Sequence, residues 1–183
     1  VRDYDYEART DGVFPEFHWK DYDINEFYSG KGDLMKSITD AEDPDLAQFL
    51  KGRGGKLIIY HGWVDTLIVA EDTLDYFNEM VNATFDGSLT QASDSARLFL
   101  APGMGHCRGG PGPDSWDKLA PMVNWVENGI APDFVTAEHR TNGQVDNQRL
   151  VCAYPQQAQY VGPFGGANDP NNWIAENFQC RDE

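Results

Sequence analysis

The chain has 183 residues, of which 40% are hydrophobic and 13% aromatic, and this composition is typical of a folded globular protein. Its formal net charge of −16 disfavours nucleic acids and anionic membrane surfaces as partners, because both would repel it. No apolar run reaches the length of about 18 residues that a membrane-spanning helix needs, so we expect no membrane segment.

The first half of the chain predicts a helix, a strand and a second helix after an irregular start. Residues 1–30 carry many aromatic side chains among acidic ones without a clear period, so we expect irregular structure there. Residues 44–52 predict a short helix with Asp43 as its N-cap. Residues 56–60 predict a buried strand, and the apolar spacing of residues 70–81 predicts an amphipathic helix.

The second half predicts another buried strand, another helix and a long tail. We expect a polar loop at residues 82–95, a buried strand at 97–101, and a loop rich in glycine and proline at 103–113. Residues 115–127 predict a helix, and residues 135–139 a strand or extended edge. The apolar face expected on the 115–127 helix consists of Trp116, Leu119, Met122, Val123 and Val126.

This order of elements predicts the fold class. Strand, helix, strand and helix with short connections are typical of an α/β fold, in which helices cover both faces of a parallel sheet. Two buried strands do not complete such a sheet. We therefore expect the chain to be the C-terminal part of a larger α/β domain, with the missing strands supplied by another polypeptide.

An ionisable residue follows each buried strand. Asp65 ends the segment Leu57–Asp65, and His106 lies in the glycine-rich segment Pro102–Cys107. Reactive groups of parallel α/β sheets lie on loops that leave the carboxyl ends of the strands. Aspartate and then histidine, each after its own strand, is the order of the α/β-hydrolase fold, in which a serine precedes both. We therefore predict that His106 is the general base and acid of an acyl transfer, oriented by Asp65.

The other histidines are interpreted as structural. His61 ends the first strand, and we expect it to bond nearby backbone and orient the Asp65 turn. His18, between two aromatic residues, is interpreted as a packing residue, and His139 has no partner at a recognisable spacing. No two histidines have the spacing of metal ligands, so no metal site is assigned to this chain.

A nucleophile for this reaction is missing from the sequence. No serine lies in the Gly-X-Ser-X-Gly pattern that the strained nucleophile turn requires. The serines are Ser29, Ser37, Ser88, Ser93, Ser95 and Ser115. Cys107 directly follows His106, and adjacent side chains on extended backbone point apart, so we reject Cys107 as the nucleophile.

Three cysteines leave one without a partner. Cys152 and Cys180 bracket a segment with little apolar periodicity, which predicts a disulfide that holds this tail, worth about 3 kcal/mol. Cys107 is then either a free buried thiol or bonded to a cysteine outside this chain. Asn82, in Asn-Ala-Thr, is a predicted N-glycosylation site and agrees with secretion.

Two segments carry a resemblance to a known family. Residues 54–65 (Gly-Gly-Lys-Leu-Ile-Ile-Tyr-His-Gly-Trp-Val-Asp) resemble the catalytic-aspartate segment of the fungal tannase and feruloyl esterase family. Residues 102–113 resemble its catalytic-histidine segment, including the cysteine directly after the histidine, and the tail from Leu150 to Cys180 is also similar. The resemblance runs from about Pro44 to Cys180 and implies ester hydrolysis on an α/β-hydrolase fold.

The resemblance also implies a partner chain. It implies that Cys107 is bonded to a cysteine directly before the catalytic serine, in an N-terminal chain cut from the same precursor. Fungal tannases are processed into two such disulfide-linked chains, and this chain would be the C-terminal one. Residues 1–43 would be the end of a lid domain, and residues 44–183 the C-terminal part of the catalytic domain with its disulfide-held tail.

Calcium is the one metal that the resemblance implies. A structural calcium ion is expected in the lid, with ligands outside this chain. No cofactor is expected for catalysis. The acidic residues Asp3, Asp5 and Asp11 are a weaker candidate and are interpreted as solvated carboxylates.

The leading hypothesis is a secreted serine carboxylic ester hydrolase that cleaves galloyl esters. A feruloyl esterase of the same family is the first alternative, and a peptidase of the same fold is another. The third is a secreted, non-catalytic carbohydrate-binding module, suggested by the five Trp and eight Tyr. Such modules are mostly antiparallel, and the helix-separated apolar strands speak against one here.

Overall fold

The computed structural model describes Asn25 and residues 39–182. The chain divides into two units, Val1–Glu42 and Asp43–Glu183. The assignment of residues 1–43 to a lid stays a prediction. Apart from Asn25, the expectations for residues 1–30, including those for His18 and the Asp3, Asp5 and Asp11 cluster, lie outside the described residues. No helix within the described ranges is long and apolar enough to cross a membrane.

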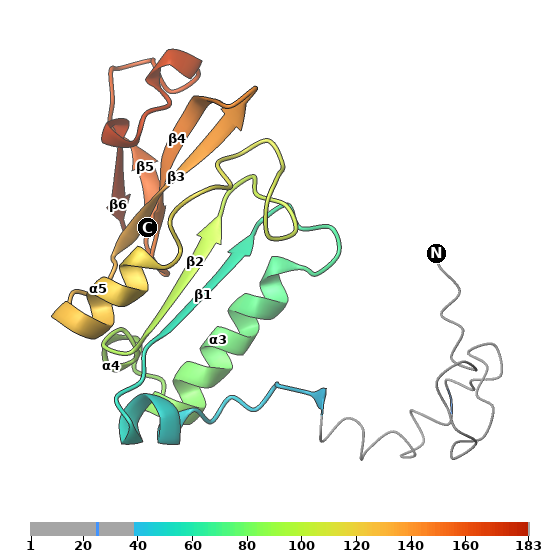
Figure 1. Ribbon diagram of the computed structural model, residues 1–183, viewed down its shortest axis with the longest axis vertical. Coiled ribbons are helices and arrows are strands. Elements are labelled where there is room, and N and C mark those ends of the chain that lie inside the picture. Colours follow the sequence, from blue (N-terminus) through green and yellow to red (C-terminus); the bar gives the residue numbers. More distant parts are fainter. Residues whose placement is uncertain (1–24, 26–38, 183) are drawn as a thin grey trace. The chain divides into compact units, whose positions relative to one another are not determined.

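Two parallel strands form the centre of the second unit (Figure 1). β1 (Leu57–Gly62) and β2 (Ala96–Ala101) pair in parallel, with the last residue of one opposite the last residue of the other. Both strands were predicted from the sequence to within two residues. Among the residues that the structure describes, β1 pairs with β2 alone, so its other edge is open.

One face of this strand pair is covered by the long helix α3 (Ala70–Phe85), as Figure 1 shows. Phe77 and Met80 of α3 are buried against Leu98 of β2. Burial of each such side chain contributes about 1.5–3 kcal/mol to stability. The apolar spacing in residues 70–81 therefore predicted both the helix and the face that it buries.

The helix continues four residues beyond its predicted end at Val81. The buried Thr84 hydroxyl accepts a hydrogen bond from the Leu46 N–H (2.9 Å) and donates one to the Pro44 carbonyl oxygen (3.1 Å). A partner 38 residues away thus holds the last turn, which the local sequence does not reveal. The loop predicted at 82–95 is correspondingly shorter and contains the short helix α4 (Leu89–Ala92).

The short helix predicted at 44–52 is smaller than expected. A π-helical turn, η4, covers only Gln48–Gly52. Asp43 does not cap it, because its side chain accepts the Asp45 N–H (3.0 Å), and Asp45 in turn accepts the Ala47 N–H (3.0 Å). These two aspartate turns occupy the residues that the prediction gave to the first helical turn.

The opposite face of the strand pair is covered in part by a hairpin, which the expectation of helices on both faces did not include. β3 (Phe134–Thr141) and β4 (Gln144–Cys152) pair in antiparallel register. Val135 and Val151 of the hairpin are buried together with Phe99 of β2. The sequence indicated only a short edge strand here, because β4 is rich in polar residues.

The last long helix, α5 (Ala120–Asn128), starts five residues later than predicted. Asp117 accepts the N–H groups of Leu119 and Ala120 (2.9 Å each), so the helix begins after it, with Pro121 in the first turn. Within α5 the buried residue is Trp125, which the predicted apolar face did not include. Lys56 and Arg97 lie over the Trp125 ring, 5.4 and 5.3 Å from its centroid. Three members of the predicted face are exposed: Leu119, Val123 and Val126.

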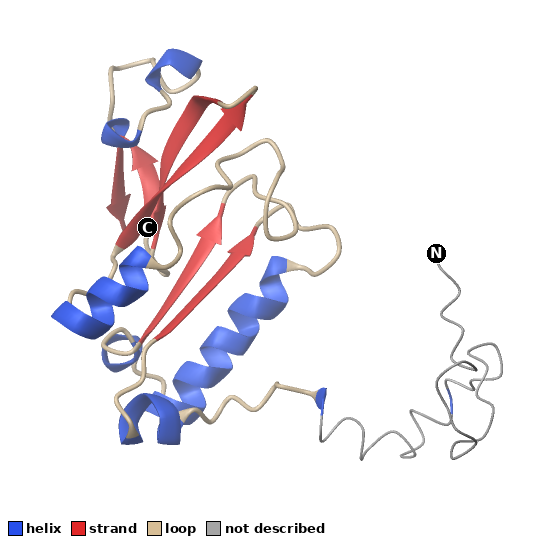
Figure 2. Ribbon diagram, in the orientation of Figure 1, coloured by secondary structure: helices blue, strands red, loops and turns tan. Residues whose placement is uncertain are grey.

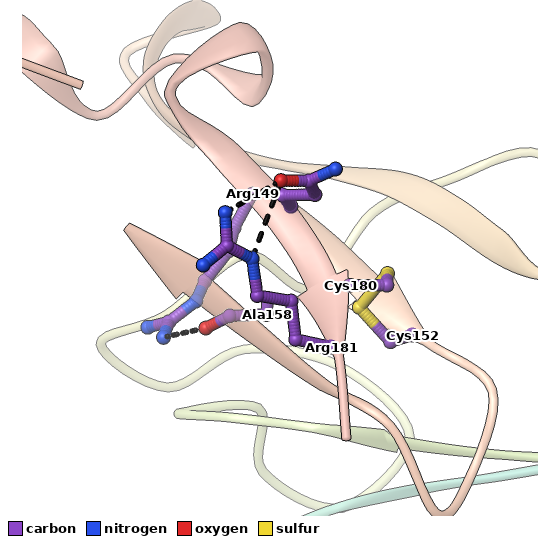
Figure 3. Close-up of a disulfide and its surroundings, with 6 residues drawn as sticks. Arg149, Cys152, Ala158, Cys180 and Arg181 are labelled. Carbon is purple, nitrogen blue, oxygen red and sulfur yellow. Dashed lines mark hydrogen bonds between the residues drawn. A yellow bond between two sulfur atoms is a disulfide. The ribbon is translucent and has the colours of Figure 1, made fainter. Parts of the chain in front are cut away.

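The tail has more regular structure than its sequence indicates (Figure 2). β5 (Gln157–Tyr160) and β6 (Phe178–Arg181) form a second antiparallel pair, joined through the short 3-10 turns Pro170–Asn172 and Ala175–Asn177. The Cys152–Cys180 disulfide expected from the sequence is present and links β4 to β6 (Figure 3). Beside it, the partly buried Arg149 donates to the Ala158 carbonyl oxygen (3.4 Å).

Removal of this disulfide should loosen the tail and leave the strand pair intact. The double variant C152A/C180A is expected to lose about 3 kcal/mol of protection in β5 and β6, because the loop between the cysteines regains its freedom in the opened state. Native-state hydrogen exchange measures this loss residue by residue. β1 and β2 amides serve as the internal control, and equal loss of protection in all four strands would contradict a local role.

Candidate active site

The loops after β1 and β2 are held together by their backbones. The Trp63 N–H donates to the Ala101 carbonyl oxygen (3.0 Å), and the Val64 N–H donates to that of Met104 (3.1 Å). Gly62 permits this approach, because a Cβ atom there would overlap the Met104 carbonyl oxygen. Parallel strands that end at the same edge therefore bring the aspartate turn against the histidine loop.

The histidine loop is also closed on itself. The Gly105 N–H donates to the Gly109 carbonyl oxygen (2.7 Å), and the Gly109 N–H donates to the Asp114 carboxylate (2.5 Å). Gly110 has φ +100°, and a side chain there would collide with the Gly103 carbonyl oxygen. The glycines predicted as a loop thus build a tight turn that fixes His106. Asp114 is a supporting residue that the sequence analysis missed.

Asp65 and His106, predicted to act together, are in contact. His106 Nδ1 lies 2.8 Å from Asp65 Oδ2, within the hydrogen-bond distance that a catalytic pair needs. The Asp65 side chain is 3% exposed, and that of His106 is 47% exposed. No hydrogen bond from the part of the chain that the structure describes reaches His106 Nε2, so the second ring nitrogen faces outward.

The Asp65 carboxylate is ionised and fixed. Burial alone would raise its pKa, but hydrogen bonds from the Ile68 N–H, from His106 and from the Leu67 N–H, together with the charge of His106, hold that pKa well below its usual range. The two backbone donors reach Oδ1 at 3.1 Å (Ile68) and 2.8 Å (Leu67). Oδ2 is thereby left to face the histidine.

His61 lies on the other side of the same carboxylate. Its Nε2 is 3.0 Å from the Ile68 carbonyl oxygen and 3.2 Å from Asp65 Oδ2. Its Nδ1 is 2.7 Å from the hydroxyl of Thr73, in the first turn of α3. The predicted bond to nearby backbone is present, while the contact with Thr73 was not foreseen.

His139 also has a partner that the sequence analysis missed. Its Nδ1 lies 2.6 Å from Asp146 Oδ1 across the β3–β4 hairpin, and Thr141 donates to the second oxygen of Asp146 (2.6 Å). A register shift of the hairpin between His139 and Arg140 accompanies this pairing. His139 and Asp146 are seven residues apart in the sequence, and this spacing alone does not predict their contact, because the contact depends on the register of the hairpin.

No nucleophile is found beside His106 in the described part of the chain. The serines described there are Ser88, Ser93, Ser95 and Ser115, and none has a hydrogen bond to His106. Cys107 is a free, exposed cysteine with φ +63°, in the left-handed region that favours glycine. The expectation of a buried thiol is therefore wrong. Within residues 39–182, no group of three or more His, Cys, Asp and Glu side chains is placed to hold a metal ion.

Apolar side chains that lack cover surround the aspartate turn. Trp63 is 41% exposed, Leu67 76% and Ile68 51%. Exposed apolar side chains grouped beside polar groups mark binding or contact surfaces. The turn that carries Asp65 therefore presents an apolar surface next to an outward-facing imidazole.

The sequence is similar to a family model and to known ester hydrolases. The family model described as "Tannase and feruloyl esterase" matches residues 15–180. Mono(2-hydroxyethyl) terephthalate hydrolase of Piscinibacter sakaiensis is 44% identical over 168 residues, covering 87% of this chain and 26% of that protein. Feruloyl esterase B of Aspergillus niger is 34% identical over 148 residues, covering 73% of this chain and 28% of that protein.

The fold is also similar to that of solved structures. Feruloyl esterase B from Aspergillus oryzae superposes with a TM-score of 0.71 at 26% identity, covering 91% of this chain and 34% of that one. Tannin acyl hydrolase from Aspergillus niger superposes with a TM-score of 0.66 at 22% identity, covering 83% of this chain and 27% of that one, which shows a shared fold. The chain thus spans about a quarter to a third of the length of these relatives.

A side chain at Gly62 should separate the two loops. The variant G62A is expected to lose about 1–3 kcal/mol of unfolding free energy, because the added methyl group meets backbone rather than a movable side chain. Urea denaturation measures the loss. G52A is the matched control, since a Cβ at Gly52 has its nearest neighbour at 3.7 Å. Equal stability of both variants would contradict the proposed close approach.

Proposed function

The chain belongs to the tannase and feruloyl esterase family, and we propose on this basis that it is part of a serine carboxylic ester hydrolase. The observation that carries the proposal is the 2.8 Å hydrogen bond between the buried Asp65 carboxylate and the half-exposed His106 imidazole. Binding of a carbohydrate does not require a hydrogen-bonded aspartate and histidine pair, so the alternative of a non-catalytic carbohydrate-binding module is disfavoured.

His106 is proposed to move the protons of the reaction. Its outward Nε2 takes the proton of a serine hydroxyl as the serine attacks the ester carbonyl, and returns it to the leaving alcohol. Water then repeats the step and releases the acid from the acyl-enzyme. Asp65 keeps the Nδ1 hydrogen in place and stabilises the imidazolium. Serine and oxyanion donors are proposed to come from another polypeptide.

A disulfide-linked N-terminal chain is the proposed source of the serine. Two observations support it: Cys107 is exposed directly beside His106, and β1 has an open edge in the described structure. An additional parallel strand at that edge would extend the sheet. A bond from Cys107 to a cysteine next to the serine would tie nucleophile and base together. Proteolytic processing of one precursor is proposed to generate the two chains.

Esters of aromatic carboxylic acids are the proposed substrates. The exposed apolar side chains of Trp63, Leu67 and Ile68 beside Asp65 support an apolar substrate, because a planar ring gains from such contacts. Galloyl esters are the proposed acyl class within this group. Relatives with higher identity are named for ferulate and terephthalate esters, which supports these as the second candidates.

Secretion, glycosylation and calcium remain part of the proposal. Asn82 is exposed on α3, which supports its modification, while Thr84 of the same motif is buried. The proposed structural calcium ion has its ligands in the lid outside this chain.

Replacement of His106 or Asp65 should abolish turnover while the fold survives. In the complete enzyme, H106A and D65N are each expected to lower kcat by at least about 10³-fold, since the first removes the base and the second fixes the wrong tautomer. Hydrolysis of methyl gallate, methyl ferulate, mono(2-hydroxyethyl) terephthalate and a peptide amide measures the loss. The same panel separates the tannase, feruloyl esterase and peptidase alternatives.

H139A is the matched control for these variants, because His139 also pairs with a carboxylate but lies on the hairpin. Its kcat should stay within about twofold of wild type. Near-normal turnover of H106A or D65N on every ester would contradict the proposed function.

The thiol of Cys107 provides a separate test of the partner chain. Non-reducing mass spectrometry of the protein from its natural source should find Cys107 bonded to a cysteine of a second polypeptide, beside a serine. Cys152 and Cys180 should be found bonded to each other in the same digest. A free Cys107 thiol would refute the disulfide-linked partner.

A further inference from the structure

We propose that His61 is a positioning residue of the active site, which acts through Asp65 and not on the substrate. The proposal rests on the proposed function and deepens it. The structure joins four side chains in one row, from the Thr73 hydroxyl through His61 and Asp65 to His106. This row links the first turn of α3 to the predicted catalytic base.

The neighbours of His61 fix which ring nitrogen carries hydrogen. Nε2 faces two groups that can only accept, the Ile68 carbonyl oxygen (3.0 Å) and the ionised Asp65 Oδ2 (3.2 Å), so Nε2 is protonated. Nδ1 then accepts from the Thr73 hydroxyl at 2.7 Å, because a hydroxyl can donate. Each ring nitrogen of His61 then has a partner.

His61 contributes to the orientation of the Asp65 carboxylate through the turn that follows it, because Nε2 bonds the Ile68 carbonyl oxygen and lies 3.2 Å from Asp65 Oδ2. Two backbone N–H groups hold Oδ1, and the two imidazoles approach Oδ2 from His61 and His106. With donors on both oxygens the carboxylate plane cannot rotate, and Oδ2 stays aimed at His106 Nδ1. The His61 and Asp65 side chains are only 12% and 3% exposed, so little water competes for these bonds.

A direct chemical role for His61 does not fit this geometry. Both ring nitrogens are already engaged, and neither is free to exchange a proton with a substrate. The outward-facing nitrogen of the site belongs to His106. His61 therefore acts on the reaction only through the direction in which it holds Asp65.

Two amide variants distinguish the role of His61 Nε2 from that of Nδ1. In H61Q the side-chain amide reaches as far as Nε2 and can still donate to the Ile68 carbonyl oxygen beside Asp65, whereas in H61N it reaches only as far as Nδ1 and that donor is lost. Measured on methyl ferulate and methyl gallate with the complete enzyme, H61N is expected to lower kcat by about 10- to 100-fold, with KM within about twofold. H61Q should retain kcat within about threefold.

A stability role alone would give a different result. If H61N and H61Q lose kcat equally, or if H61N keeps wild-type kcat, the proposal is overturned. Should H61N fail to fold, T73V carries the test, because it leaves the ring in place and removes only its second partner. T73V should then lower kcat by about 3- to 10-fold while T73S restores it, and unchanged kcat in T73V would overturn the proposal.

The parallel variants D65N and H106A distinguish this proposal from the proposed function. Retained activity in those two variants would refute ester hydrolysis by this site. Lost activity in D65N and H106A together with full activity in H61N would refute the role of His61 alone.

Discussion

The site depends on the close approach of two backbone segments at the ends of β1 and β2. Gly62 lies against the Met104 carbonyl oxygen, and the N–H groups of Trp63 and Val64 bind carbonyl oxygens of the second loop. Without that approach the turns that carry Asp65 and His106 would lie too far apart for the two side chains to bond. Parallel pairing supplies the common edge, and the absence of a side chain at Gly62 supplies the short distance.

A buried carboxylate is stable in this place only because its oxygens are saturated with donors. Desolvation disfavours the charged form of Asp65, yet the backbone of Leu67 and Ile68 and the His106 imidazole more than compensate. The low pKa that results keeps the carboxylate ionised across the neutral range. In the proposed role of His61, its ring, bonded to Thr73 on α3, holds the Ile68 carbonyl oxygen of the same turn and lies beside Asp65 Oδ2.

Several surfaces of the described unit expose groups that proteins usually cover. β1 has an open edge, α5 exposes Leu119 and Val126, and the apolar side chains around Asp65 lack cover. Soluble domains bury such groups against another layer of structure. The chain spans about a quarter to a third of its relatives' length, and these surfaces support the proposal that residues outside this chain complete the domain.

Local sequence determined the two strands, the buried face of α3 and the residues that follow each strand, because apolar runs and glycine turns are encoded in neighbouring positions. The tertiary structure decided how these pieces meet. The extension of α3 depends on a bond between Thr84 and Leu46, and the cover of β2 depends on a hairpin whose polar β4 resembles a loop in sequence. The partners of His61 and His139 likewise arise from packing and register, which no spacing along the chain specifies.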